Sequence, residues 1–441
     1  MAAFSLLSPL RHRDFALLWV GMAVSLLGDG IYFVAIAWQV YDLTETPSAL
    51  ALVGLAWSLG MVGFLLLGGS VADRVDRRMQ MVVADVVRLL AVSAMGVLAV
   101  TGTVEVWHLV LLSLVFGIGE AFFAPAFSAL IPSLLPAELL VQANALHQVI
   151  RPATFRLAGP ALGGLLVAAF GAGTAFLIDA ATFLVAIGCV LAIRFRPSAV
   201  DRALDAASGG VREGMVWARR EPWFWATLAI AALGILLTAG PMEVLLPYVI
   251  RVDLDAPASA FGLVLAAGGV GGIAGGLLVS RIGMPRRPLA LMWVAWGGAV
   301  VMIATFAMAT AVWQLAALTF FYGAGMASGM VVWGTLMQTR VPPEMLGRVS
   351  ALDWTVSLGL LPLSFALTGP AAALIGTDAT LIAGGLLAAV VTIALWLLVP
   401  DLRADDERGP GSGQRGEVVE EAGVADGGRL HPDDLHPVAG R

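Results

Sequence analysis

The sequence contains no lysine, so all 25 of its basic residues are arginine. It therefore lacks the phosphate-binding lysine of a Walker A loop and any lysine that could form a Schiff base. This absence argues against an ATP-driven pump encoded in the one chain. The single cysteine, Cys189, permits no intrachain disulfide. The five histidines have no metal-ligand spacing, so we expect no metal site and no cofactor.

Charged residues are also scarce. They make up 13% of the 441 residues, whereas hydrophobic residues make up 59% and the mean hydropathy is +0.90. Soluble domains could not bury so much apolar surface, so we expect an integral membrane protein and not an enzyme. The net charge of -6 comes mostly from residues 401–441, and nothing is basic enough to indicate a nucleic-acid partner.

Twelve apolar runs are each long enough for a helix that crosses the hydrocarbon core, which takes about 20 residues. The runs cover residues 15–40, 49–71, 79–100, 107–130, 144–170, 174–193, 224–249, 258–279, 289–309, 312–338, 349–373 and 379–399. The first run is too long for the apolar segment of a signal peptide, so we expect it to remain as a helix. The sequence thus predicts an all-α membrane protein with twelve transmembrane helices.

The distribution of arginine predicts the orientation of these helices. With the amino terminus placed in the cytoplasm, 21 arginines fall in cytoplasmic segments and only Arg251 falls in an outer loop. The remaining three, Arg88, Arg151 and Arg156, lie within helices. Positive charge is retained on the cytoplasmic side of membranes, so both termini are expected there.

An internal repeat divides the chain. Gly-x-x-x-Asp-Arg at 69–74 returns as Gly-x-x-x-Ser-Arg at 276–281, an offset of 207 residues, and Gly-Pro at 159–160 returns at 369–370, an offset of 210. Chance matches in so biased a sequence are the alternative. A duplication of six helices in one orientation predicts two pseudo-symmetric six-helix bundles.

The expected domains follow from the repeat. Residues 1–193 form the first bundle and residues 223–400 the second. A cytoplasmic linker at 194–222 could contain a short interfacial helix, because aromatic and arginine side chains alternate there. The acidic tail at 401–441 is expected to be disordered.

A short charged loop, residues 69–78, joins the second and third predicted helices. Gly69 could let the end of a helix approach a neighbour closely, and Asp73 could accept hydrogen bonds from helix-end amides or from Arg77. The arginines of the loop, which include Arg74, would hold it at the anionic cytoplasmic leaflet. A plain positive-inside loop is the alternative.

Three ionisable residues are expected deep in the membrane, where each costs about 2.5 to 3.5 kcal/mol and is functional by default. At about 1.5 Å per residue, Asp29 and Glu120 lie about 20 Å into their helices, and Arg156 lies at similar depth. A buried carboxyl group holds a proton more readily, and a neighbouring cation releases it again. We therefore predict Asp29, Glu120 and Arg156 as substrate-binding and proton-coupling residues. The alternative is that one carboxylate only neutralises Arg156.

Other ionisable residues are also expected within the helices. Asp85 lies only about 9 Å into its helix, so it can form a local, structural ion pair with Arg88 three residues on. Asp179 and Glu243 lie towards the outer side, where water could reach them.

These features resemble the major facilitator superfamily, and within it the bacterial branch that includes the enterobactin exporter and macrolide or multidrug efflux proteins. The segments that carry the resemblance are GDGIYFVAIAWQVYDLT at 28–44, GGSVADRVDRR at 68–78, FFAPAFSALIP at 122–132, GPALGG at 159–164 and RVPPEMLGRVSAL at 340–352. Together they extend over nearly all of the predicted membrane part.

The resemblance implies roles for the loop between helices 2 and 3. Gly69, Asp73, Arg74 and Arg77 match the signature of a cytoplasmic gate that latches the two halves together in the outward-open state. Ser280 stands where the second-half counterpart of Asp73 would be, so the second latch is expected to be weaker.

The resemblance also bears on the helix interior. Helices 1, 4, 7 and 10 line the central cavity in this superfamily, which places Asp29 and Glu120 beside the substrate. Residues Gly159, Pro160, Gly163 and Gly164 resemble the antiporter motif of helix 5 in exporters. Phe155 stands where that motif often has another glycine, and the same residues could form only a kink and a helix contact.

We therefore predict a secondary active transporter that exports small lipophilic molecules, of the drug, antibiotic or siderophore class, in exchange for protons by alternating access. It would be a multi-pass monomer in the bacterial inner membrane, with the substrate, protons and the lipid bilayer as its only partners. A metabolite uptake carrier of the same fold, or a non-transporting membrane scaffold or sensor, are the alternatives.

Overall fold

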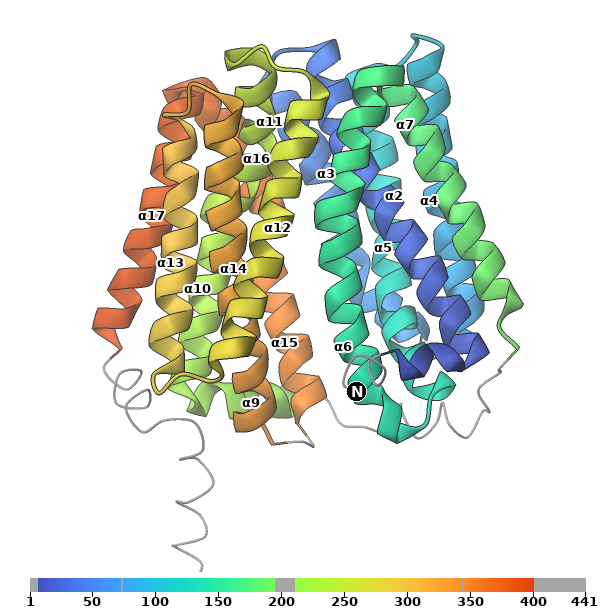
Figure 1. The fold of residues 1–441 in the computed structure, drawn as a ribbon, viewed down its shortest axis with the longest axis vertical. Coiled ribbons are helices and arrows are strands. Elements are labelled where there is room, and N and C mark those ends of the chain that lie inside the picture. The colour runs from blue at the N-terminus through green and yellow to red at the C-terminus, as the bar shows by residue number, and fades with distance from the viewer. Residues whose placement is uncertain (1–6, 73, 195–210, 343–344, 400–441) are drawn as a thin grey trace, which may run out of the picture.

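The computed structural model describes residues 7–72, 74–194, 211–342 and 345–399. Within them, eleven helical stretches are long and apolar enough to cross a membrane. The longest, Gln142–Ala192, has 51 residues, which is about 77 Å of helix at about 1.5 Å per residue and more than twice the thickness of a hydrocarbon core. Gly171 interrupts it with φ 79° and ψ 163°, a conformation that favours glycine. The chain reverses there (Figure 1), so the stretch crosses twice and the predicted twelve crossings are confirmed.

The crossings form two six-helix halves, which lie side by side in Figure 1. The first half contains η1 (Ser8–Arg11), α2 (Arg13–Leu43), α3 (Pro47–Ala72), α4 (Arg77–Val100), α5 (Val106–Leu134), η2 (Ala137–Leu139), α6 (Leu140–Arg151), η3 (Pro152–Ala158) and α7 (Gly159–Ala192). The second contains α10 (Pro222–Gly240), η4 (Pro241–Leu245), α11 (Leu246–Tyr248), η5 (Val249–Asp253), α12 (Ala258–Ile282), α13 (Pro288–Phe306), α14 (Val312–Arg340), α15 (Leu346–Gly359), α16 (Leu361–Ile375) and α17 (Thr377–Leu398).

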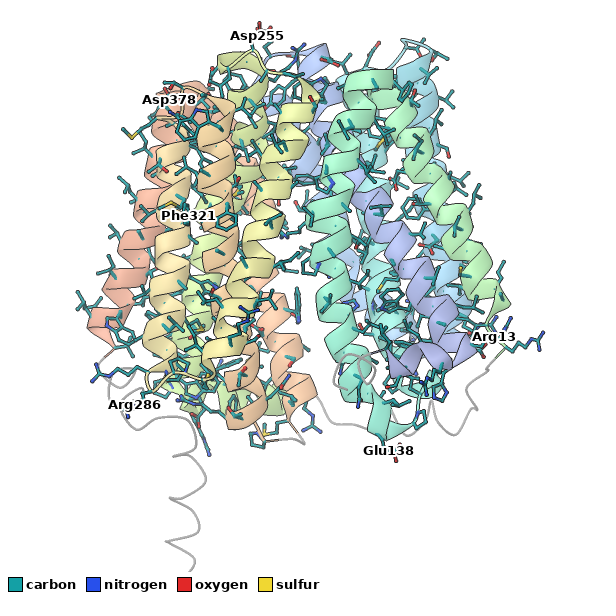
Figure 2. The ribbon with its side chains drawn as sticks, in the orientation of Figure 1. Arg13, Glu138, Asp255, Arg286, Phe321 and Asp378 are labelled. Carbon is teal, nitrogen blue, oxygen red and sulfur yellow. The ribbon has the colours of Figure 1, made fainter. Side chains whose placement is uncertain are left out.

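The ends of the bundle differ in charge. Arg13 and Arg286 lie at the end that holds the start of α2, which we call the basic end, whereas Asp255 and Asp378 lie at the other, which we call the opposite end (Figure 2). Phe321 is 62% exposed on the flank between them. Charged residues thus mark the two ends and large apolar side chains the flank, as expected for a protein that spans a bilayer.

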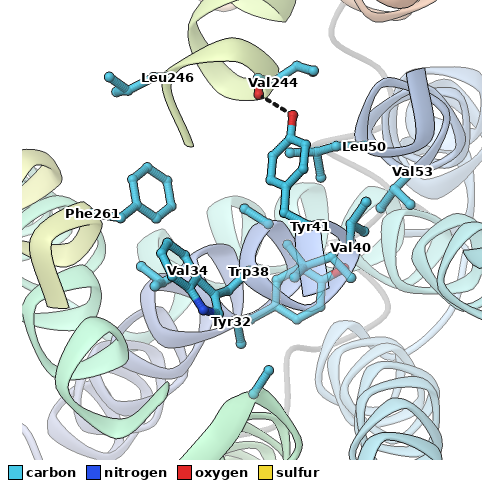
Figure 3. Packing of buried hydrophobic residues seen from close by; sticks show 14 of the residues in the cluster. Tyr32, Val34, Trp38, Val40, Tyr41, Leu50, Val53, Val244, Leu246 and Phe261 are labelled. Atoms are coloured by element: carbon cyan, nitrogen blue, oxygen red, sulfur yellow. Dashed lines mark hydrogen bonds between the residues drawn. The ribbon is translucent and has the colours of Figure 1, made fainter. Parts of the chain in front are cut away.

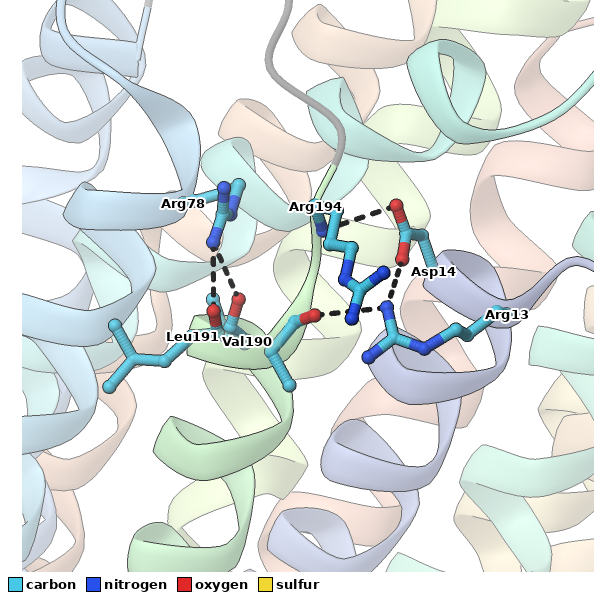
Figure 4. A network of polar contacts seen from close by, with 7 residues as sticks. Arg13, Asp14, Arg78, Val190, Leu191 and Arg194 are labelled. Carbon is cyan, nitrogen blue, oxygen red and sulfur yellow. Dashed lines mark hydrogen bonds and ion pairs between the residues drawn. The ribbon is translucent and has the colours of Figure 1, made fainter.

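At the basic end, arginines bind the last carbonyls of α7 (Figure 4). Arg78 on α4 donates to the carbonyl oxygens of Val190 and Leu191 at 3.2 and 3.1 Å. Arg13 donates to the carbonyl oxygen of Ala192 at 3.1 Å and pairs with Asp14 at 3.0 Å. Cationic side chains satisfy helix carboxyl ends in this way, and here they join α2, α4 and α7.

A short helix, α9 (Val211–Arg220), lies in the linker. The ring of Trp217 lies 5.5 Å from that of Phe224 and 6.3 Å from that of Trp223, both on α10. Ala218 is 4% exposed. The helix is therefore packed on the second half. The remaining linker residues, 195–210, and the tail from residue 400 lie outside the described residues.

The two halves contact each other along two seams towards the opposite end. On one seam, α7 meets α12, where a Cβ atom on Gly164 would lie 2.9 Å from Cα of Gly262. On the other seam, α3 meets α16, where the ring of Trp57 packs edge-on against that of Phe365 at 6.3 Å. Helix backbones approach each other as closely as α7 and α12 do at Gly164 and Gly262 only where the residues are small.

The buried hydrophobic core is continuous across the seams (Figure 3). Tyr32, Val34 and Trp38 on α2 share it with Val244 on η4 and Phe261 on α12. Apolar packing and the seams together close the halves on each other at the opposite end.

Candidate transport site

A buried arginine on α4 lies at the centre of a group of charged residues in the first half. The Arg88 side chain is 3% exposed and forms an ion pair with Asp85, one turn earlier on the same helix. Its Nη1 atom also lies 3.8 Å from Oδ2 of Asp29 on α2, whose side chain is 16% exposed. The predicted local pair of Asp85 and Arg88 is therefore present, and Arg88 in addition reaches Asp29 on another helix.

Aromatic rings surround the Arg88 guanidinium. Its central carbon lies 4.6 Å from the ring centroid of Phe123, 4.7 Å from that of Phe183 and 5.9 Å from that of Phe116. Gly119 leaves room for the side chain, since a Cβ atom there would lie 2.6 Å from Cγ of Arg88. Ring faces attract a cation and exclude water, so the charge of Arg88 is neutralised mainly by its carboxylate partners.

Asp179 on α7 belongs to the same region and is completely buried. A Cβ atom on Gly28 would collide with its Oδ1 atom and with Oγ1 of Thr182, so the carboxyl group lies against the backbone of α2 next to Asp29. The expectation that water reaches Asp179 is therefore wrong. Close packing of α2 on α7 seals the group, a feature that the sequence position alone does not reveal.

A hydroxyl pair lies beside these carboxyl groups. The hydroxyl of Tyr32 on α2 and that of Ser113 on α5 are 3.1 Å apart, and both residues are buried. The Tyr32 ring stacks on Phe116 at 4.6 Å. The hydroxyl pair is linked to the charged group through Phe116, whose ring centroid also lies 5.9 Å from the Arg88 guanidinium.

Glu120, Arg156 and Glu243 are three further ionisable residues within the helices of the two halves. Glu120 on α5 accepts a 3.0 Å hydrogen bond from Nε1 of Trp57. Arg156 lies in the π-helical turn η3 and Glu243, which is half-buried, lies in the π-helical turn η4. Single π-helical turns are frequent at functional sites.

The predicted site residues Asp29, Glu120 and Arg156 thus have different partners and surroundings. Asp29 is paired with Arg88, whereas Arg156, which is exposed, makes no ion pair among the residues that the structure describes. Sequence reasoning missed Arg88 as the partner of Asp29. The Asp85-x-x-Arg88 spacing points only to the pair within α4, and the contact with Asp29 depends on how α2 packs against α4.

Next to the loop between α3 and α4, Gly69 does not make the close helix contact that the sequence predicted. Nothing lies within 4 Å of a Cβ atom built on Gly69, so the predicted close approach is wrong there. The close approach occurs at Gly68, where a Cβ atom would collide with the carbonyl oxygen of Ala121 on α5. Gln80 fixes the same crossing, because its Nε2 atom donates to the carbonyl oxygens of Gly68 and Phe122, both at 2.9 Å.

The charged residues of that loop differ in burial. Arg77 is 4% exposed and donates a 2.8 Å hydrogen bond to the carbonyl oxygen of Ala129 on α5. Arg74 is exposed, and Asp76 caps α4 by accepting from the amide of Arg78 at 2.9 Å. Asp73 lies outside the described residues. In this conformation these hydrogen bonds of Arg77 and Asp76 lie within the first half.

The helix 5 motif lies between two helices. A Cβ atom on Gly159 would lie 2.8 Å from Cα of Gly30, and one on Gly163 would lie 2.9 Å from Cα of Ile31, both on α2. Gly164 faces α12 instead, and the carbonyl oxygen of Pro160 contacts Gly262 there. The motif therefore forms the contact of α7 with α2 on one side and with the second half on the other.

Two solved structures that this chain resembles are described as homologues of transporters. The chain resembles a bacterial homologue of the human lysosomal transporter Spinster, in an inward-facing and unoccupied conformation, with a TM-score of 0.64 and 16% identity over 90% of this chain and 97% of that one. It also resembles an inward-facing bacterial homologue of the iron transporter ferroportin, with a TM-score of 0.62 and 18% identity over 88% of this chain and 99% of that one. At such identities the likeness shows the fold alone.

Sequence relatives are named as efflux proteins. The multidrug efflux pump Tap of Mycolicibacterium fortuitum is 28% identical over 81% of this chain and 88% of its own length. Macrolide efflux protein A of Streptococcus pyogenes is 24% identical over 86% of this chain and 94% of its own length.

A family model matches more of this chain than either relative does. Residues 4–421 match the family described as transmembrane secretion effectors, and that range includes every helix of both halves. The chain belongs to the transmembrane secretion effector family of the major facilitator superfamily, and it is a membrane transporter, not an enzyme.

Proposed function

We propose that this transporter exports small lipophilic molecules from the bacterial cytoplasm in exchange for protons. The observation that carries the proposal is the position of Asp29, a 16% exposed carboxylate at the edge of a sealed ion pair. Arg88 is engaged more closely by Asp85 than by Asp29. Asp29 can therefore gain or lose a proton without leaving Arg88 unpaired.

Protonation of Asp29 would change the charge of the group but not its packing. With Asp29 ionised, two carboxylates share one cation. With Asp29 protonated, Asp85 and Arg88 remain as a neutral pair. Because charge interactions are strong where water is excluded, one proton can shift the balance between two conformations, which is the requirement for coupling proton movement to transport.

The orientation is supported by the arginines of the basic end, which we assign to the cytoplasm with both termini. The seams between the halves lie towards the opposite end, so we assign this conformation as closed to the outside. A substrate would enter from the cytoplasm, and a rocking motion of the halves would then expose it to the outside.

The surface around Trp57, Phe365 and Glu120 is the proposed substrate position. Trp57 and Phe365 provide aromatic surface from the two halves, and Glu120, which accepts the hydrogen bond of Trp57, provides negative charge. Such a mixture suits lipophilic molecules with a polar or charged group. The names of the relatives, which refer to macrolides and multiple drugs, support the same class.

We further propose that the loop residues around Asp73, Arg74 and Arg77 close the basic end in the alternate conformation, with Gly69 leaving the loop free to move. The helix 5 motif, Gly159 to Gly164, would be the contact about which the halves rock, since it touches both. The linker helix α9 would lie at the cytoplasmic surface, carried by the second half.

Transport in everted membrane vesicles tests the proposal. A panel of lipophilic drugs that includes a macrolide should be accumulated under an acid-inside gradient, with release of protons. Asp29→Asn should abolish the coupling and lower transport more than Glu243→Gln, and Asp378→Asn, at an exposed carboxyl of the opposite end, should have no effect. Proton-coupled transport by Asp29→Asn at the level of the Asp378→Asn control would remove Asp29 from the site, and the absence of any drug-linked proton movement would refute the exchange.

A further inference from the structure

Asp179 is a buried carboxyl group that the mechanism above does not use. Asp85 and Asp179 are both completely buried, but they differ in their partners. Asp85 is paired with Arg88, whereas in the described part of the chain no arginine lies within ion-pair distance of Asp179. A sealed carboxylate without a cation is strongly disfavoured, so the group needs either a proton or a full set of hydrogen-bond donors.

The hydrogen bonds of Asp179 do not supply those donors. The hydroxyl of Thr182 donates to the backbone carbonyl oxygen of Asp179 at 2.7 Å and lies 3.3 Å from its Oδ1 atom. One hydroxyl hydrogen must serve both contacts. The Oδ2 atom is buried and has no hydrogen-bond partner among the described residues. The carboxyl group thus receives at most a shared hydrogen bond, which suits the neutral acid and not the anion.

Asp179 lies close to the proposed proton-exchanging residue. Its carboxyl group contacts the α2 backbone at Gly28, the residue before Asp29, and the charges of Asp29 and Arg88 act on it. The Oδ1 atom of Asp29 is also buried without a partner. Two carboxyl groups with unpartnered oxygens therefore lie at the same level of the packed helices α2 and α7, and of the two only Asp29 is partly exposed.

The charges of this region balance when two protons are present. The charged groups that act on Asp179 are Asp29 on α2 and Arg88 on α4, and Asp179 itself acts on Tyr32. Arg88, Glu120, Asp85 and Arg151 act on Asp29. Asp85 and Arg88 form one neutral pair. The two remaining carboxyl groups leave the sealed region uncharged only if each holds a proton.

We propose that Asp179 is a second proton-binding site of the transport cycle, which exchanges its proton with water through Asp29. The proton of Asp29 passes to the Asp179 carboxylate, and Asp29 then takes another proton from water; release runs in reverse. The first half would thus carry two protons in each cycle. This inference rests on the proposed proton exchange at Asp29, and its alternative is a structural acid that never gives up its proton.

Proton counting on the purified, substrate-free transporter tests the inference separately from the transport assay. An acid jump from about pH 9 to about pH 6 is followed with an indicator dye, a range in which ordinary exposed carboxyl groups stay ionised. Asp179→Asn should bind about one proton fewer than the wild type, and Asp378→Asn should bind as many as the wild type. An unchanged count in Asp179→Asn would overturn the inference, whatever the vesicle experiment shows.

Infrared spectroscopy tests the route. A protonated carboxyl group has a characteristic carbonyl absorption, and the absorption band that disappears in Asp179→Asn belongs to Asp179. The shift of this band on transfer to heavy water reports exchange of the Asp179 proton. Asp29→Asn should slow that shift several-fold, and an unchanged rate would overturn the passage through Asp29. If Asp179→Asn fails to fold, Thr182→Val serves instead, because loss of the shared hydroxyl should move one protonated-carboxyl absorption; a spectrum without that change would overturn the assignment.

Discussion

The hydroxyl of Tyr41 on α2 donates a 2.7 Å hydrogen bond to the carbonyl oxygen of Val244 on η4 (Figure 3). Both residues are buried, and the bond joins the first half to the second. One residue on, Asp42 pairs with Arg251 on η5 at 3.3 Å, and the Arg251 guanidinium lies 5.2 Å from the ring centroid of Trp38. These contacts close the opposite end beside the seam of α7 and α12.

Tyr41→Phe should weaken this closure. The variant removes the hydroxyl that donates to the Val244 carbonyl oxygen. The loss should destabilise the closed state by about 0.5–1.5 kcal/mol and lower the closed-to-open ratio by about two- to tenfold. Spin labels on cysteines at Glu45 and Asp378, which are exposed at the opposite end in different halves, would report longer distances after Cys189→Ser removes the natural thiol. Tyr248→Phe, whose ring packs on Tyr41 at 5.8 Å, is the control and should leave the distances unchanged.

Gly164→Ala should open the same end by a different route. The added Cβ atom would lie 2.8 Å from the carbonyl oxygen of Ala258 and 2.9 Å from Cα of Gly262. These are backbone atoms that can move only if α7 and α12 separate, so the open population should rise in the same spin-label measurement. Gly63→Ala on α3 adds a Cβ atom with nothing within 4 Å and should have no effect. If the spin-label distances are as short in Gly164→Ala as in Gly63→Ala, the seam of α7 and α12 does not limit opening of the opposite end.

The crossings were predictable from sequence because each depends only on a local run of apolar residues. The pairing of the halves was partly predictable, since the repeat of the Gly-Pro motif at 159–160 implies equivalent helices. The turn between the fifth and sixth crossings was predictable as well, because small residues at 171–173 separate the apolar runs 144–170 and 174–193; only the backbone conformation of Gly171 that reverses the chain had to come from the structure.

Residue pairs that meet only through tertiary packing were not predictable. Asp85 and Arg88 are three residues apart on one helix, so their contact follows from helix geometry. The contact of Arg88 with Asp29 depends on how α2 and α4 are packed, and the burial of Asp179 depends on the absence of a side chain at Gly28. A family motif can mislead for the same reason, as the loop glycine shows.

Gly68→Ala and Gly69→Ala should differ sharply, against the expectation from the motif. A Cβ atom on Gly68 would collide with the carbonyl oxygen of Ala121, whereas nothing lies within 4 Å of one on Gly69. Gly68→Ala should therefore lower stability by about 1–3 kcal/mol through overpacking, and Gly69→Ala should be neutral or stabilising by up to about 1 kcal/mol. Thermal unfolding in detergent measures both, and a greater loss for Gly69→Ala would show that the crossing of α3 and α5 is placed wrongly.

Arg88→Met should destabilise the first half, and the double variants should show which carboxylate depends on the arginine. Removing one partner of a buried ion pair leaves an uncompensated charge and costs about 3–5 kcal/mol. Asp85 is completely buried, whereas Asp29 is 16% exposed and can be hydrated or protonated. Asp85→Asn in the Arg88→Met background should therefore restore more of the thermal stability than Asp29→Asn in that background. Equal recovery would mean that Arg88 compensates both carboxylates alike, and Asp29 would then not be free to change its protonation while the pair with Asp85 stays intact.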